Sequence, residues 1–516
     1  MDFKLNREEI STSEVIFDGL QEQSAELDYV LPDYYPEIFK IVKCIATPKI
    51  VSYSVNGDKL TYELSICMRI MYCSEQSNTL HVLDQKLNYT KTAELGKTAV
   101  KPQVLIYPKT DYINCRAVNQ RRIDVRGAIS IKIKVTDINR KEVISDAYGM
   151  NIQLRKVPVT YPSSRLYTTK RITVEDDFDL GLSKPSVLSI IRNDAIVAST
   201  DKKVIANKLV AKGEIYINML YTCMKDGADA IEAMQFTMPF SQIIDLEGID
   251  DRYDCVINAD VISCELVPKS DGDGDSKIIH CTVMLLITVS ANRLSTVDIA
   301  TDQYSTAYKS ESQTSDIKVE LSPCHINSSQ VIKGSVEYKE GELDIIYDVW
   351  CTVNGFTVKP DSNDNSLVIS GKAVYTVVAR NQSGSPVVLE KEDIFDFKVP
   401  TECISEGSIY NINIVPVSCS YTLTSDNTVE IKSELKVTGM VYNTMYMKAL
   451  TDISVNEAEP LEKDGDYALR LYFADKGEDM WEIAKKYGTS INAIMEENNL
   501  NDEVISEHGM ILIPIV

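Results

Sequence analysis

The sequence predicts a mainly β protein in which three tandem sandwich-like β domains are followed by a small α+β module with the order strand, helix, helix, strand (βααβ). Three observations support this prediction. Long runs alternate apolar and polar residues, which is the period of a half-buried strand. The longest of these runs recur three times, each at the same distance from an apolar pair that precedes it. Helical spacings of three and four residues are concentrated at the C-terminal end, after residue 467.

The β repeat is visible in three alternating runs rich in β-favouring residues, at residues 60–72, 209–221 and 367–379. An apolar pair precedes each run: Ile38-Phe39, Val187-Leu188 and Ile345-Ile346. The offsets 60−38, 209−187 and 367−345 all equal 22. Each copy ends in a second long strand, at residues 123–135, 278–289 and 428–440. Equal spacing without obvious identity is typical of a duplicated domain, and strand-rich copies of this size indicate sandwiches.

The domain boundaries follow from these copies. We place β domain 1 at residues 26–137, β domain 2 at 178–306, a divergent β domain 3 at 331–455, a linker at 456–466 and the C-terminal module at 467–516. The charged or Ser/Thr-rich segments 137–177 and 307–330 are expected to be linkers. The acidic stretch 456–466 is expected to be a mobile tether. Residues 1–25 either form an N-terminal arm or pack as an added element.

The C-terminal module can be assigned element by element. Leu469, Leu471 and Phe473 alternate with other residues, so we expect them on one buried face of a short strand. Asp479 is expected to cap a helix that ends at Gly488, and Ser490 to cap a second helix closed by Asn498-Asn499. Residues 510–514 (MILIP) form the final strand. In so small a core almost every apolar position is expected to be buried.

This order, with GEDMWEIAKKYGTSINAIMEENNL in the middle and ILIPI at the end, resembles the LysM family. The resemblance implies a βααβ fold whose two loops flank a shallow ligand groove. It places ligand-binding residues at Gly477, Glu478, Asp479, Met480, Asn501, Glu507, His508 and Gly509. Trp481 either lines the ligand face or covers the small core, and we favour the core. The module has four basic and nine acidic residues, so 4 − 9 gives a charge of −5.

Residues 26–38 (ELDYVLPDYYPEI) resemble the opening of the SPOCS domain, which is found repeatedly in clostridial spore-coat proteins. Pro185-Ser186-Val187-Leu188 resembles the opening of a second copy, and the third copy lacks this motif. Three such copies before one LysM module resemble the spore-coat assembly proteins. The resemblance implies a location in the mother-cell cytoplasm, at the forespore surface or in the spore coat. It also implies a coat-basement partner similar to stage IV sporulation protein A.

Charge and hydropathy exclude several classes of function. The formal net charge of −23 over 516 residues argues against nucleic-acid binding and against docking on anionic lipid. No stretch is apolar enough for membrane insertion, and residues 1–9 lack the apolar core of a signal peptide. We therefore expect a cytoplasmic protein, with its twelve dilute cysteines mostly buried as reduced thiols.

No catalytic residues, metal ligands or cofactor are predicted. The neighbours His280-Cys281 and Cys324-His325 would project to opposite faces of a strand, and no phosphate-binding glycine loop is present. The segment 271–275 (DGDGD) resembles the start of a calcium loop. It lacks the carboxylate that such a loop needs at its twelfth position, so we expect a hairpin turn. The chain is predicted not to be an enzyme.

Two functions from different classes remain. In the first, the protein is a non-catalytic scaffold for spore-envelope morphogenesis whose LysM module docks on a coat-basement protein while its β domains recruit or tether coat components. In the second, the LysM module binds peptidoglycan, a polymer that contains N-acetylglucosamine. The acidic module and the lack of an export signal favour the scaffold.

Overall fold

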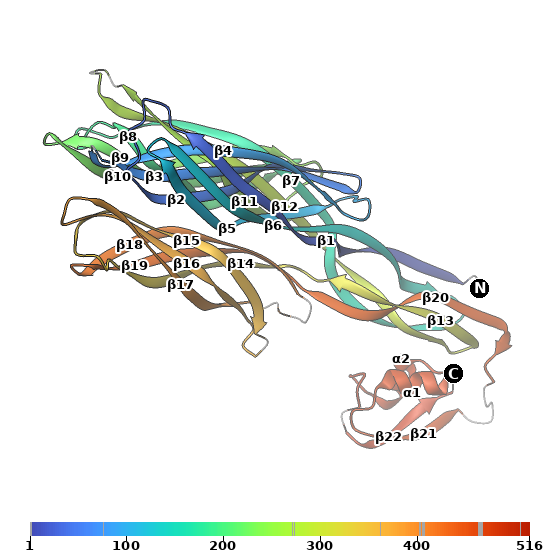
Figure 1. Ribbon diagram of the computed structural model, residues 1–516. Coiled ribbons are helices and arrows are strands. Elements are labelled where there is room, and N and C mark those ends of the chain that lie inside the picture. Colours follow the sequence, from blue (N-terminus) through green and yellow to red (C-terminus); the bar gives the residue numbers. More distant parts are fainter. Residues whose placement is uncertain are drawn as a thin grey trace.

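The computed structural model describes residues 3–75, 77–270, 272, 274–361, 363–401, 404, 408–462, 468–505 and 507–515. Most of the chain up to residue 460 is antiparallel β-strand, and the described α-helices lie beyond residue 479 (Figure 1). The predicted fold class, mainly β with a C-terminal βααβ unit, is confirmed.

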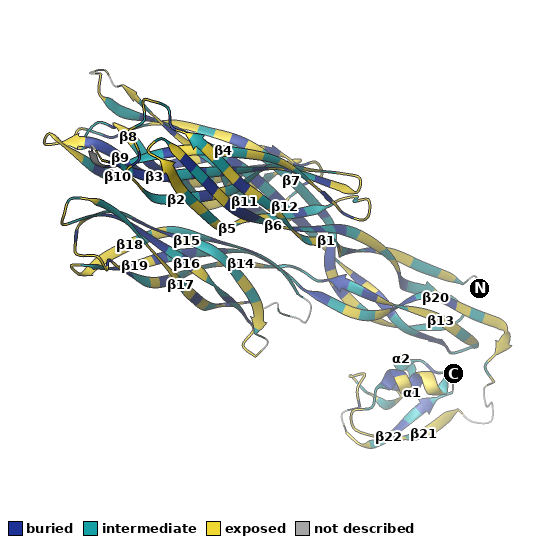
Figure 2. Cartoon of the chain, in the orientation of Figure 1, coloured by how far each residue is buried: buried dark blue, intermediate teal, exposed yellow. Residues whose placement is uncertain are grey.

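The first repeat is a sandwich of two three-stranded antiparallel sheets, with strand orders β1-β6-β5 and β2-β3-β4. Its strands are β1 (Lys4–Val30), β2 (Lys40–Asn56), β3 (Lys59–Ser74), β4 (Ser77–Glu94), β5 (Gln103–Asn119) and β6 (Arg122–Tyr148). Every second residue of β3 from Leu60 to Tyr72 is buried between the sheets, as the two-residue period predicts. Figure 2 shows this alternation of buried and exposed residues along the strands.

The second repeat has the same strand order, in the sheets β11-β12-β7 and β10-β9-β8. Its strands are β7 (Ile152–Asp179), β8 (Ser189–Ile205), β9 (Lys208–Lys225), β10 (Ala228–Asp245), β11 (Asp254–Ser270) and β12 (Ser276–Ser305). Asp226 and Gly227 both have positive φ, which is the conformation of a tight hairpin turn between β9 and β10. The 271–275 segment connects β11 to β12. Asp271 and Asp273 lie outside the described residues.

The third repeat differs because each of its two longest strands is interrupted. Its strands are β13 (Tyr308–Glu320), β14 (Cys324–Glu337), β15 (Leu343–Asp361), β16 (Ser366–Asn381), β17 (Pro386–Pro400), β18 (Ile409–Ser425), β19 (Thr428–Tyr442) and β20 (Thr444–Pro460). One long strand is divided into β13 and β14, and the other into β19 and β20. The two breaks face each other, since the Leu321 backbone N–H donates to the Asn443 carbonyl at 2.9 Å. Pro323, which has no N–H to donate, lies in the first break.

The segments between the copies are part of the strands. Residues 1–25 were expected as an arm or an added element, and from Lys4 onward they belong to β1, paired along β6. The expected linkers 137–177 and 307–330 lie mostly in β6, β7, β13 and β14. Of the expected tether, residues 456–460 end β20, and residues 463–466 lie outside the described residues.

Beyond the sandwiches, each repeat extends a two-stranded ribbon, and the three ribbons share one core. The ribbons are β1–β6, β7–β12 and β13–β20. Buried residues from all three meet, including Ile10, Tyr161, Ile299 and Val319. A second shared core joins the sandwiches, where Leu220 of repeat 2 packs with Met71 of repeat 1 and Trp350 of repeat 3.

Polar contacts also link the repeats in a ring. Arg69 of repeat 1 donates to Asn193 of repeat 2, Arg192 of repeat 2 donates to Asp348 of repeat 3, and Lys43 of repeat 1 pairs with Glu390 of repeat 3. The Arg192 guanidinium also lies 4.0 Å from the centre of the Trp350 ring. The repeats are therefore packed together rather than strung apart.

The C-terminal unit contains β21 (Leu469–Ala474), α1 (Met480–Tyr487), α2 (Ile491–Asn498) and β22 (Gly509–Pro514). The two strands form an antiparallel sheet, and α2 packs on β22. None of the helices in the described ranges has the length and apolarity that a membrane crossing requires. Ten of the described cysteines are free thiols, whereas Cys324 is disulfide-bonded, contrary to the expectation of reduced thiols throughout.

Candidate functional site

Helix α1 begins and ends where the sequence predicted. Asp479 is its N-cap and accepts a hydrogen bond from the Trp481 backbone N–H at 3.0 Å. Gly488 closes the helix with φ of 64°, a left-handed conformation that glycine adopts without a Cβ clash. The first turn carries Glu482 and the last turn carries lysines, which suits the helix dipole.

Helix α2 is tied to the sheet by one side chain. Ser490 caps the helix, and Asn499 ends it with φ of 52°. The Asn498 amide nitrogen donates to the carbonyls of Ile494 and Leu512, at 2.8 and 2.6 Å, and its oxygen accepts from the Leu512 N–H at 2.6 Å. The sequence predicted Asn498 as a helix-closing residue, but not this bridge to β22.

The predicted ligand-binding residues lie on two loops that are hydrogen-bonded to each other. The Gly477 N–H donates to Ile505 at 2.8 Å, and the Ile505 N–H donates to Glu478 at 3.1 Å. The Met480 N–H donates to Glu503 at 3.0 Å. Glu503 and Ile505 were not predicted as site residues, because backbone pairing leaves no side-chain pattern.

The eight predicted residues differ in accessibility. Gly477, Asn501, Glu507 and His508 are exposed, whereas Glu478, Asp479 and Gly509 are half-buried. Met480 is fully buried in the module core, so its side chain cannot contact a ligand directly. The helical stripe that Met480 shares with Ile483 and Ala484 explains this burial.

The acidic side chains of the first loop are already engaged. Glu478 accepts hydrogen bonds from the Tyr472 hydroxyl and from the Asp475 N–H, both at 3.0 Å. The hydrogen bond to Glu478 raises the pKa of Tyr472. Asp479, besides capping α1, lies 2.8 Å from the Arg155 guanidinium of repeat 2. Both carboxylates are therefore already held by contacts within the chain.

The sheet of the module presents an apolar face to solvent, which corrects one expectation. Leu471, Phe473 and Met510 are 69%, 66% and 70% exposed, and Leu469 is also exposed. The residues of β21 that contact the module core are instead Tyr472 and Ala474. Both faces of this strand carry apolar residues, so alternation alone could not identify the inner one. Phe473 lies opposite Met510 in the strand register, which makes the face continuous.

Trp481 is buried, as we favoured, but the residues that bury it include some from β12, outside the LysM module. Its ring packs edge-on against Tyr304 of β12, with ring centres 5.0 Å apart. Its indole N–H donates to Asp302 at 2.7 Å. Tyr304 belongs to the same buried cluster as Trp481, Ile483 and Ile494. No pattern in the sequence indicates that a residue of β12 completes the LysM core.

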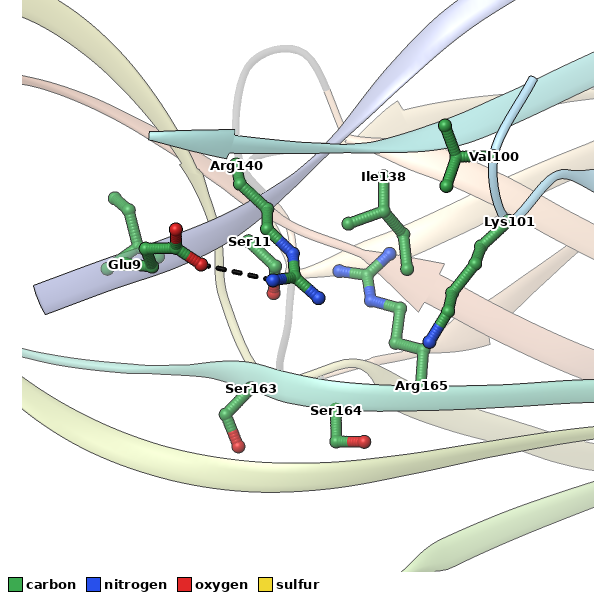
Figure 3. Close-up of a pocket in the computed structure, with 10 residues that line it drawn as sticks. Glu9, Ser11, Val100, Lys101, Ile138, Arg140, Ser163, Ser164 and Arg165 are labelled. Carbon is green, nitrogen blue, oxygen red and sulfur yellow. Dashed lines mark hydrogen bonds and ion pairs between the residues drawn. The ribbon is translucent and has the colours of Figure 1, made fainter. Parts of the chain in front are cut away.

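A separate cavity of about 270 Å³ lies between the first two repeats (Figure 3). Its basic lining residues are Lys101, Arg140 and Arg165. Arg140 pairs with Glu9 at 3.1 Å, and Arg165 lies 2.9 Å from Glu320. A neighbouring cavity is lined by Asp137, whose carboxylate accepts from the Lys101 N–H at 2.8 Å. Both guanidinium groups of the first cavity are therefore already paired with carboxylates of the chain.

The geometry defines a tandem β-repeat protein that carries a small βααβ module with a solvent-facing apolar sheet. Residues 186–267 match the family model described as SipL, SPOCS domain, and residues 475–514 match the LysM domain model. The chain therefore carries a SPOCS domain and a C-terminal LysM domain, as the motifs predicted. Comparisons with curated proteins and with solved structures returned no match.

The matched families set the broad function. The SPOCS and LysM domains indicate a role in spore-coat assembly, and both are non-catalytic domains. The SPOCS match also fits a location in the spore coat. Within the described residues, no group of three or more His, Cys, Asp or Glu side chains is arranged to hold a metal ion.

Proposed function

We propose that the protein is a non-catalytic scaffold for spore-envelope morphogenesis. Its LysM module docks on a coat-basement protein similar to stage IV sporulation protein A. The β repeats recruit or tether further coat components, and the protein works in the mother-cell cytoplasm at the forespore surface. The observation that carries this proposal is the exposed apolar sheet of the module.

The apolar sheet has the composition of a protein-docking surface. Leu471, Phe473 and Met510 lie together on one face, and each is more than half exposed. Contiguous exposed apolar residues commonly mark interaction sites, and aromatic residues and Met are enriched in protein interfaces. A partner that covers this face removes apolar area from water, which favours association. The net charge of −5 on the module favours partners with basic groups around the contact.

The first two repeats offer a second exposed apolar surface for tethering. The loops that open them expose Tyr34 and Phe39 in one repeat and Leu182 and Leu188 in the other. These positions follow β1 and β7, which are equivalent strands in the two sandwiches. Repetition of the same exposed feature supports a role of these loops in holding coat components.

The alternative is binding of peptidoglycan through the LysM loops. Hydrogen-bonded pairing of the loops and engagement of Glu478 and Asp479 leave fewer free polar groups for a sugar. The module charge of −5 also does not favour a neutral sugar over a protein ligand. We therefore rank this function second. The two functions use different faces, so substitutions can separate them.

The proposal is tested by a binding assay with the full chain. The partner is purified coat-basement ATPase of the stage IV sporulation protein A type, and purified peptidoglycan is offered in parallel. Leu471→Asp and Phe473→Asp should each weaken partner binding by about 30-fold, equivalent to about 2 kcal/mol. Leu182→Asp, which also places a charge at an exposed leucine, is the matched control and should not change binding to this partner. Glu507→Lys tests whether the predicted ligand-binding loops contribute to binding of either ligand.

The outcomes distinguish the two functions. Loss of partner binding with the sheet variants supports the scaffold. If the protein instead binds peptidoglycan, and Glu507→Lys alters that binding while Leu471→Asp does not, peptidoglycan binding would replace the scaffold as the function.

A further inference from the structure

The LysM module is seated on the β7–β12 ribbon rather than hanging from a free tether. The contact lies near the start of β7 and the end of β12, next to residues 149–151, which connect β6 to β7. Figure 1 shows the two helices on the side of the module that faces the rest of the chain, with β21 and β22 on the far side.

Three side chains of the ribbon are placed on one face by strand geometry. Asp302 and Tyr304 are two residues apart on β12, so they project in the same direction. Arg155 of β7 lies directly opposite Asp302 in the register and shares that face. A register shift between Ala300 and Asp302 bends the strand immediately before the seat, which re-aims the side chains that follow it.

Side chains of α1 and its N-cap contact this face of the ribbon. Trp481 and Lys485 are four residues apart and therefore lie on the same side of the helix. Lys485 donates to both oxygens of Asp302 at 2.7 Å, and Trp481 donates to the same carboxylate. Asp479 pairs with Arg155 at 2.8 Å, so each partner contributes one positive and one negative charge.

The aromatic contact adds an apolar component to the seat. Tyr304 is 6% exposed, packs edge-on against Trp481, and donates its hydroxyl to the Thr489 carbonyl at 2.7 Å. Edge-to-face pairs are favourable beyond the area they bury, and a buried hydroxyl with a partner avoids a desolvation penalty. The contact therefore combines burial, a ring pair, hydrogen bonds and opposite charges.

We propose that this contact is an intramolecular latch. It fixes the orientation of the LysM module, covers the 479–489 face with the β7–β12 ribbon and leaves the β21–β22 face free. A ligand that needs the Asp479 side must displace Arg155, whereas a partner on the sheet face binds without opening the latch. The latch is a property of the chain alone and does not depend on the proposed partner.

Charge reversal in the full chain tests the latch. Amide hydrogen exchange of peptides covering α1 is measured for Asp302→Lys, for Lys485→Asp and for the double variant. Each single variant places like charges together, so α1 exchange should become about tenfold faster, which corresponds to about 1.4 kcal/mol of lost protection. The double variant should recover part of that protection. Asp298→Ala, an exposed residue on the same strand, is the control and should leave α1 unchanged.

Two results would overturn the latch. One is α1 exchange that is unchanged in both single variants. The other is a double variant that exchanges as fast as the faster single variant, because the pair would then not be in contact. Neither measurement uses a binding partner, so its failure is separate from failure of the proposed docking function.

Discussion

At the residue scale, Asp302 determines how the LysM module is held. Burial raises the pKa of this carboxyl, but hydrogen bonds from Lys485, Trp481 and the Gln303 N–H outweigh burial and lower it below its ordinary value of 3.8. A carboxyl with a lowered pKa stabilises the state in which it is paired, and it does so as long as it is ionised. The neighbouring charged groups are Arg155, Asp479 and Lys485.

The pKa shift predicts how the latch depends on pH. Asp302 contributes its full stabilisation above the ordinary pKa of 3.8, and this contribution is lost as the pH falls through the lower, docked value. Protection of α1 should thus hold between about pH 7 and 5 and fall below about pH 4. Asp302→Asn should start with weaker protection and lose less of it on acidification. Hydrogen exchange corrected for its intrinsic pH dependence measures this difference, and identical profiles for the two proteins would contradict it.

A second prediction concerns Asn498, whose side chain makes three hydrogen bonds, two to Leu512 of β22 and one to Ile494 within α2. Asn498→Ala removes all three and leaves the Leu512 backbone groups without this partner. The free energy of unfolding of the module should fall by about 2 kcal/mol, since each lost bond contributes about 1 kcal/mol or less. Denaturant-dependent exchange of the β22 amides in the full chain measures the change. Asn492→Ala, at an exposed position of the same helix, should have little effect.

At the element scale, the sequence predicted α1 and α2 well because local chemistry defines their ends. Asp479, Gly488, Ser490 and Asn499 all take the capping roles that their residue types favour. The orientation of β21 could not be predicted in the same way. Its two faces are Leu469, Leu471 and Phe473 on one side and Arg470, Tyr472 and Ala474 on the other, and both contain apolar residues. Only the packing of the helices selects the inner face.

The long strands show a second limit of sequence reasoning. Parts of β1, β6 and β7 lie in two-stranded ribbons whose residues are largely half-buried or exposed, so their alternation is weak. Charged and proline-containing stretches such as 137–177 therefore suggested linkers. Their stabilisation comes from pairing with distant strands and from the shared ribbon core, which no local pattern records.

The two roles of Asp479 can be separated at the start of α1. Asp479→Asn keeps an oxygen that can cap the helix but removes the charge that meets Arg155, whereas Asp479→Ala removes both. The alanine variant should lower helix stability by about 1 kcal/mol, and the asparagine variant by about 0.5 kcal/mol or less because the ion pair is partly exposed. Exchange of the α1 amides measures both changes. Equal losses in the two variants would show that the cap is not the main role.

At the scale of the whole molecule, three repeats converge on two shared cores. One core joins the ribbons and the other joins the sandwiches, which are also linked by the polar contacts of Arg69, Arg192 and Lys43. Tandem repeats that touch only their chain neighbours behave as a one-dimensional array. Here repeat 1 also contacts repeat 3, so the assembly is closed. A closed assembly provides a rigid base from which the latched LysM module projects in one direction.

This closure predicts that the repeats unfold together. Ile299 of repeat 2 is fully buried in the ribbon core, so Ile299→Ala should lower the free energy of unfolding by about 3 kcal/mol. The reporter is the fluorescence of Trp350 in repeat 3, in a Trp481→Phe background that leaves one tryptophan. Because the core is shared, the urea midpoint of the Trp350 signal should shift although the substitution lies in another repeat. Asp298→Ala, one residue away and exposed, should leave the midpoint in place. If Ile299→Ala leaves the urea midpoint of the Trp350 signal unchanged while the amides of repeat 2 lose protection from exchange, the repeats unfold independently.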